Sequence, residues 1–169
     1  MGPPDDSSIR ETAGASVRRI YESGGNFEIA IERGLATCRV WSRPDVSRED
    51  GARFALHNVE ALQRLVGEAV TAVGAVVLDL RQAPSSWGSV TQSCLERMLA
   101  ILESAHRAIA IVCDNEMQRE QMRRIQKIHA KTQGMLFDSL DDAEAWALAR
   151  RPGPLQAAAA PNIDRGGYR

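Results

Sequence analysis

The sequence has few cysteines, and its charges are almost balanced. Its 169 residues include three cysteines, Cys38, Cys94 and Cys113, without any C-x-x-C spacing, so it predicts neither a disulfide framework nor a zinc site. Lys and Arg total 21 against 22 Asp and Glu, a formal net charge of -1, which argues against nucleic-acid binding through bulk charge. We therefore expect no metal, no cofactor and no nucleic-acid partner.

Long apolar runs and targeting signals are also missing. No window of the sequence approaches about 18 uninterrupted apolar residues, the length that a transmembrane helix requires. The chain starts MGPPDDSSIR, with acids where a signal peptide needs basic residues and no apolar region after them. We expect a cytoplasmic protein with no membrane partner.

The motifs of several common enzyme classes are absent. The sequence has no G-x-x-x-x-G-K-[ST], no H-E-x-x-H, no G-x-S-x-G, and no G-x-G-x-x-G after a strand pattern. The segment VVLDLRQAP resembles the phosphoacceptor strand of a receiver domain, but Asp79 lies inside the strand pattern. The acidic pair and the lysine that a receiver domain needs are missing as well. We expect a non-enzymatic protein without catalytic residues.

Composition divides the chain into two ends and a middle. Residues 1–26 are rich in Gly, Pro, Ser and charged residues, and residues 150–169 hold mainly Pro, Gly and Ala, so both ends are expected to be flexible tails. Within the first tail, the segment from Val17 to Tyr21 could form one helical turn. Residues 27–149 carry the periodic apolar pattern of a single folded domain.

Strand patterns recur through this middle region. Apolar and polar side chains alternate at its start, as in a half-buried hairpin, with a turn at Arg33-Gly34. Two later runs are continuously apolar apart from Asp79, which is typical of central strands covered on both faces. The predicted strands cover residues 27–32, 35–41, 75–80, 108–112 and 135–137.

Helix patterns fill the segments after the hairpin. The expected N-caps are Ser47, Ser89, either Asp114 or Asn115, and Ser139. In the helix expected at 116–131, the predicted apolar side is Met117, Met122, Ile125 and Ile128. The arginines and lysines of this helix form either a basic docking face or a solvated face with i,i+4 ion pairs. The element order predicts an α/β fold with a mixed β-sheet, an N-terminal antiparallel hairpin, parallel crossovers, and helices packed on the sheet.

Three motifs in this order resemble a known domain family. W-x-x-P-D-x-S-x-E-x-G-A from Trp41, V-L-D-L-R-x-A-P from Val77 and M-Q-R-x-Q-x-x-R-I from Met117 are similar to STAS-like proteins found as small single-domain chains in some bacteria. STAS domains include anti-sigma-factor antagonists. The likeness covers residues 27–149 and implies a STAS-like regulatory domain that binds a protein partner, such as an anti-sigma factor or a kinase. The sequence leaves open whether the chain also forms a weak homo-oligomer.

The resemblance also implies where phosphorylation would occur. Anti-sigma-factor antagonists carry Asp-Ser-[Ser/Thr]-Gly at the start of the helix after this strand, and the partner kinase phosphorylates the second hydroxyl residue. Counted without gaps from VLDL, that acceptor is Ser89, while the family's Asp, first Ser and Gly are replaced. A shift of two residues would instead bring either Trp87-Gly88 or Ser85-Ser86 to the same turn. The phosphorylation candidates are therefore Ser89, Ser86 and Ser85.

General physical arguments also mark the 84–90 loop as a binding surface. It leaves the carboxyl end of a central strand, where open α/β sheets place their ligands, and a helix start attracts anions. Ser89 either acts only as an N-cap or is also phosphorylated. Trp87 either packs against the sheet or is exposed as an anchor for a partner. We expect a protein partner at Trp87, Gly88 and Ser89. The alternatives are a scaffold or localisation module, and a small-molecule sensor lined by the loop serines and Arg81.

Overall fold

The structure is a computed structural model that describes residues 17–68 and 73–151. Its sheet contains six strands, which lie side by side in their sequence order, β1-β2-β3-β4-β5-β6. The pairings β1–β2 and β2–β3 are antiparallel and the later ones are parallel. The strands are β1 (Arg19–Ser23), β2 (Phe27–Glu32), β3 (Leu35–Trp41), β4 (Ala75–Gln82), β5 (Ala108–Val112) and β6 (Gly134–Phe137). The helices are α1 (Arg48–Gly67), α2 (Ser89–Ser104), α3 (Glu116–His129) and α4 (Leu140–Arg150). The predicted α/β class with a mixed sheet is confirmed.

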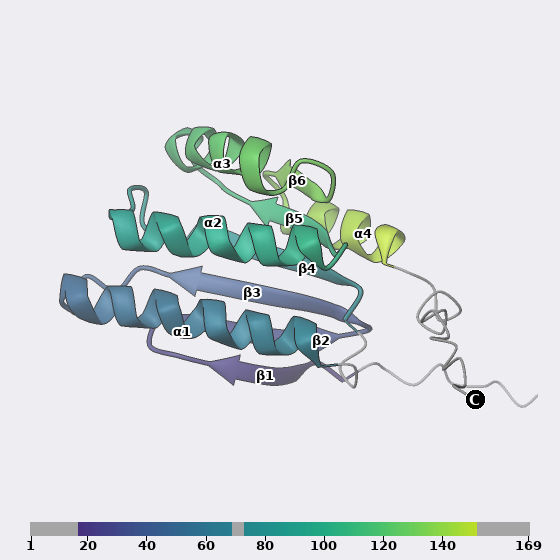
Figure 1. The fold of residues 1–169 in the computed structure, drawn as a ribbon, viewed down its shortest axis with the longest axis horizontal. Coiled ribbons are helices and arrows are strands. Elements are labelled where there is room, and N and C mark those ends of the chain that lie inside the picture. The colour runs from purple at the N-terminus through teal and green to yellow at the C-terminus, as the bar shows by residue number, and fades with distance from the viewer. Residues whose placement is uncertain (1–16, 69–72, 152–169) are drawn as a thin grey trace, which may run out of the picture.

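Helices cover both faces of the sheet, but unequally (Figure 1). The first three helices pack with one face of the strands into a large apolar cluster, in which α1 and α2 lie side by side. The last helix, α4, packs on the other face and closes a smaller cluster over β4, β5 and β6. None of the helices formed by the described residues has both the length and the apolar character needed to cross a membrane.

The two central strands contribute to both clusters. In β4, Val76 and Leu78 belong to the large cluster and Val77 to the small one, because successive side chains of a strand point to opposite faces. In β5, Ile111 packs in the large cluster and Val112 in the small one. The prediction of central strands covered on both faces is therefore confirmed.

The N-terminal region differs from the expectation. Arg19–Ser23 form the edge strand β1, with a bulge between Ile20 and Glu22, so the prediction of a helical turn at 17–21 is wrong and the expected tail at 1–26 contains a strand. The unpaired edge of β2 and the packing of Tyr21 against the large cluster explain this choice. Residues 1–16 and 152–169 lie outside the described residues.

Three of the four predicted helix starts have the expected cap. The side chains of Ser47, Asn115 and Ser139 each accept a backbone N–H of the first turn. The prediction for Ser89 is wrong, because the N-cap of α2 is Gly88 and Ser89 is the first helical residue. The physical reason is that the backbone N–H of Gln92 bonds to the Gly88 carbonyl oxygen, 3.0 Å away, which starts the helix one residue earlier.

Helix α3 is rotated relative to the predicted apolar side. Met122 and Ile125 are buried as expected, whereas Met117 and Ile128 are 59% and 66% exposed. The residue that turns inward at the start of α3 is Gln118, which is completely buried. Its side-chain amide donates hydrogen bonds to the connection between β4 and α2, so Gln118 faces the interior at this turn and Met117 faces solvent.

Candidate functional site

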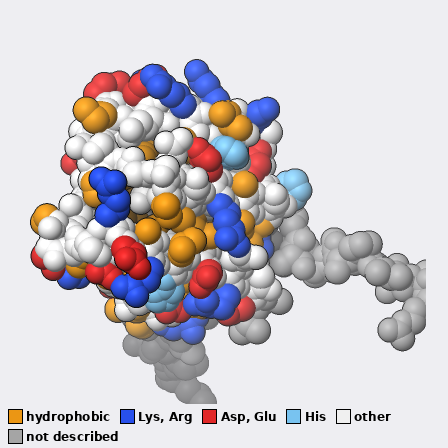
Figure 2. Space-filling model, turned by 60° about the vertical axis from the view of Figure 1, so that its left-hand side comes forward, with side chains coloured by type: hydrophobic (Ala, Val, Ile, Leu, Met, Phe, Trp, Pro, Cys, Tyr) orange, Lys and Arg blue, Asp and Glu red, His pale blue; other side chains and the backbone are white. Residues whose placement is uncertain are grey.

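A cleft of about 600 Å³ opens where the carboxyl ends of β3 and β4 meet the starts of α1 and α2. Its lining includes four of the five predicted loop residues, namely Ser86, Trp87, Gly88 and Ser89. Ser85 is not among the lining residues. When this end of the molecule is turned toward the viewer, hydrophobic side chains gather near the middle of the surface, with Lys and Arg side chains on both sides of them (Figure 2).

The β4–α2 loop, residues 83–88, presents most of its side chains to solvent. Ser85, Ser86 and Gly88 are exposed, as is Ser89 at the start of α2. Trp87 is half-buried and packs against the large apolar cluster, while part of its side chain remains accessible to solvent. A Cβ added to Gly88 would meet nothing within 4 Å. A binding partner therefore has free access to the backbone at this point.

Gln118 fixes the first part of this loop. Its side-chain Nε2 donates to the carbonyl oxygens of Ala83 and Pro84, at 2.8 and 3.0 Å. Its own backbone N–H is held by the cap residue Asn115 at 2.9 Å. These hydrogen bonds connect the loop to α3 at residues 83–84. The rest of the loop, residues 85–88, follows this anchored segment.

The start of α2 is chemically unlike the starts of the other three described helices. Each of the others has a capping side chain and at least one acidic residue in its first turn. The start of α2 has Gly88 as its cap, no capping side chain and no acid. The partial positive charge at this helix end is therefore uncompensated by side chains.

The opposite side of the cleft is formed by the end of β3 and the first half of α1. Trp41, Arg43, Arg48 and Asn58 line it, and no Asp or Glu is part of the lining contributed by the described residues. Arg43 is already engaged, because its guanidinium donates to both carboxylate oxygens of Asp45, at 2.8 and 2.7 Å. These hydrogen bonds hold the pKa of Asp45 at about 2.

A buried ion pair lies beside the cleft, on the face of the sheet that α4 covers in part. The Asp79 carboxylate is 2% exposed and accepts from Arg81 Nε and Nη2, at 2.8 and 2.9 Å, and from Arg39 Nε at 3.3 Å. Burial alone would raise the pKa of Asp79, but the hydrogen bonds and charges of these arginines hold it below its ordinary value. Arg81 is therefore paired with Asp79 and does not line the cleft. The prediction that Arg81 would line a small-molecule pocket is wrong on this point.

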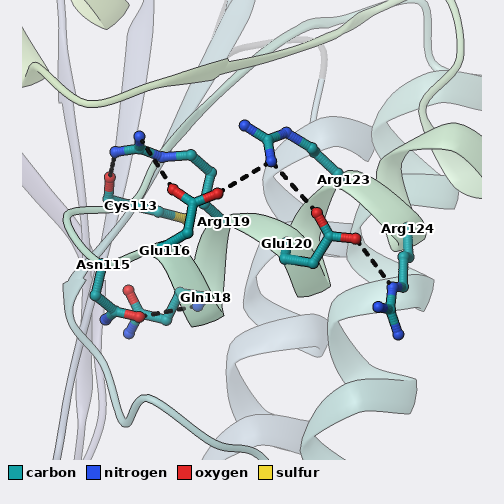
Figure 3. Close-up of polar contacts among 8 residues, drawn as sticks. All are labelled: Cys113, Asn115, Glu116, Gln118, Arg119, Glu120, Arg123 and Arg124. Carbon is teal, nitrogen blue, oxygen red and sulfur yellow. Dashed lines mark hydrogen bonds and ion pairs between the residues drawn. The ribbon is translucent and has the colours of Figure 1, made fainter.

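The charged residues of α3 are largely paired with one another (Figure 3). Arg123 lies between Glu116 and Glu120, at 3.2 and 3.3 Å, and Arg124 reaches Glu120 at 3.3 Å, as the i,i+4 pattern predicts. Arg119 folds back to the carbonyl oxygen of Cys113 at 3.2 Å. These contacts favour the interpretation of a solvated, ion-paired face over that of a basic docking face.

Two residues of this region were not predicted, although the sequence carries a signal for both. Asn58 and Gln118 are polar side chains at buried helix positions, one beside Val59 and the other one turn before Met122. A polar residue within an apolar stripe is expected to have a specific hydrogen-bond partner. For Gln118 that partner is the β4–α2 loop, and for Asn58 it is the Cys38 thiol, 3.3 Å away.

Comparisons with known proteins identify the fold and no more. No protein-family model matches the sequence, and no curated protein matches it. Among solved structures, the NMR structure of the protein TM1081 is similar, with a TM-score of 0.50 and 13% sequence identity. The likeness covers 77% of this chain and 94% of that chain. It supports the α/β mixed-sheet architecture and carries no information on activity at this level of identity.

Proposed function

We propose that this chain is a non-enzymatic regulatory module that binds a protein partner through the β4–α2 loop and the start of α2. The observation that carries the proposal is the combination of exposed Ser85, Ser86 and Ser89 with half-buried Trp87 beside an open cleft. A large aromatic anchor surrounded by small polar groups is typical of binding hot spots. The resemblance to STAS domains supports the same surface and a cytoplasmic site of action, with an anti-sigma factor or a kinase as partner.

Phosphorylation of Ser89 would control this interaction in the proposed mechanism. Ser89 is exposed and lies in the first turn of a helix without an acidic residue or a capping side chain. A phosphate there would be stabilised by free backbone N–H groups and would add about -1.5 to -2 charges to the surface. Constitutive binding is the simpler form of the proposal, because the family's Asp-Ser-Ser-Gly pattern is incomplete.

The test of the surface is a comparison of variants in partner binding. The partner is isolated from native lysate with the parent chain, identified, and then titrated as a purified protein. Trp87→Ala is expected to weaken binding at least about tenfold, as for a hot-spot tryptophan, while Trp87→Phe loses less. Wild-type affinity in a folded Trp87→Ala variant would show that the loop is not the interface.

The test of the switch uses a matched pair of charge substitutions on α2. Ser89→Asp is compared with Ser93→Asp, since Ser93 is exposed on the same helix but does not line the cleft. Phosphorylation control predicts that Ser89→Asp alone loses the partner and that intact mass of the native protein shows an increase of about 80 Da, the mass of one phosphate group. Equal binding by both variants would refute the switch and leave constitutive binding.

A further inference from the structure

We propose that the cleft between α1 and α2 is a binding site for a small organic anion. The acidic group would lie between the start of α2 and the Arg48 side of the cleft, and the apolar body would lie against Trp41 and Trp87, which line the cleft. This inference goes beyond the proposed function, because it concerns a free ligand and not the protein partner. The volume of about 600 Å³ is within the range of small-molecule sites.

The first observation is the charge of the lining. Arg43 and Arg48 line the cleft, and no carboxylate from the described residues does so. Asp45 engages Arg43, whereas Arg48 is exposed and forms no ion pair with any residue of 17–68 or 73–151. A cation without a counter-charge at the rim of a cleft favours a ligand of negative charge.

The second observation is independent of charge and comes from Asn58. This side chain is only 4% exposed and lines the cleft. Its Oδ1 accepts from the Cys38 thiol at 3.3 Å, but its Nδ2 donates to no acceptor in the described part of the chain. This Nδ2 is not among the fully buried unpaired side-chain atoms of the described residues, so it is open to the cleft and available to donate there. Asn58 therefore points to a ligand that brings an oxygen acceptor into the cleft.

Further donors face the same space. The indole nitrogens of Trp41 and Trp87 make no hydrogen bond within the described residues, and both side chains are half-buried lining residues. The first N–H groups of α2 lack a capping side chain. The residues of 17–68 and 73–151 that line the cleft thus offer several hydrogen-bond donors and a free arginine but no acidic group, around an apolar floor that includes Leu80, Leu95 and Met98. An amphipathic anion complements this arrangement.

The experiment compares two dyes that differ in one group. 1-Anilinonaphthalene-8-sulfonate carries an anionic sulfonate, and N-phenyl-1-naphthylamine has the same aromatic body without it. Fluorescence titration of the full chain is expected to show one saturable site that binds the sulfonate at least about tenfold more tightly than the neutral dye, as a charge-assisted contact predicts. Energy transfer from Trp87 to the bound sulfonate should fall in Trp87→Phe.

Variants assign the site to the cleft. Arg48→Gln should weaken sulfonate binding at least about fivefold and leave the neutral dye unaffected, and Asn58→Leu should weaken it too if the variant folds. Arg53→Gln is the control, since Arg53 is an exposed arginine of α1 outside the lining. Equal affinity for both dyes, or equal losses in the two arginine variants, would overturn the proposal. The partner assay is separate, so either proposal can fail without the other.

Discussion

Replacing the buried carboxylate of Asp79 by an amide tests the electrostatics of the sheet. In Asp79→Asn the shape is kept and the negative charge is removed. The amide nitrogen then faces a guanidinium that can only donate, so one branch of the Arg81 fork is lost, and the contact with Arg39 weakens. We expect the folded state to be destabilised at neutral pH, with the overall fold unchanged.

The magnitude follows from the burial of the three groups. A hydrogen bond to a charged group contributes about 1.5–3 kcal/mol, and breaking a fully buried pair costs about 3–5 kcal/mol. Here Asp79 is 2% exposed, but the side chains of Arg81 and Arg39 are 35% and 41% exposed, so water can solvate them in the variant. We therefore expect a loss of about 2 kcal/mol in the free energy of unfolding.

The pH dependence gives a second, sharper criterion. The pKa of Asp79 is lowered in the folded state, so its contribution is complete above the unfolded value of about 3.9 and is lost as the pH falls through the folded value. Urea unfolding should show a constant difference between parent and variant at pH 5–8 that shrinks below about pH 4.

The control for this measurement is Asp45→Asn. Asp45 is also paired with an arginine, Arg43, but its carboxylate is largely exposed, so a much smaller change is expected in its unfolding midpoint. A difference for Asp79→Asn below about 0.5 kcal/mol at pH 7, or one that persists unchanged at pH 3, would refute the assignment of the stabilisation to the buried charge.

Three further predictions concern the core and the loop. Ile111→Ala should lower the free energy of unfolding by about 2–5 kcal/mol in chemical denaturation, and a loss below about 1 kcal/mol would contradict its central position. Gln118→Met should cost about 1–3 kcal/mol and speed amide exchange in residues 83–88; unchanged exchange would show that Gln118 does not hold the loop. Burial raises the pKa of Cys38 and of Cys113 to about 12, so a disulfide reagent at pH 8 should modify neither thiol before unfolding, and rapid native labelling would disprove this.

The sequence was most informative where the local pattern and the packing agree. The runs at 75–80 and 108–112 are apolar on both faces, and both faces are covered in the structure. The caps Ser47 and Ser139 depend on a contact only three residues away, which a local pattern can specify. The strand β1 was not predicted, because its formation depends on the free edge of β2 and not on its own composition.

The site was predicted in part for a similar reason. The loop could be located because it follows a recognisable central strand, and four of its predicted residues do line one cleft. The partners that shape the cleft come from distant positions, as in the contacts between Gln118 and Ala83, 35 residues apart, and between Cys38 and Asn58, 20 residues apart. A single sequence contains the polar residue but not the identity of its partner.

The position of α4 has a consequence for the order in which the protein can mature on the ribosome. The strands β4 and β5 are synthesised before Leu140–Arg150, yet one of their faces is covered by this helix alone among the described elements. At translation speeds of about 5–20 residues per second, the alanines and valines of that face await their cover for several seconds. The nascent chain therefore passes through a stage in which it needs protection from association with its neighbours, and a chain that terminates before residue 140 would remain at that stage.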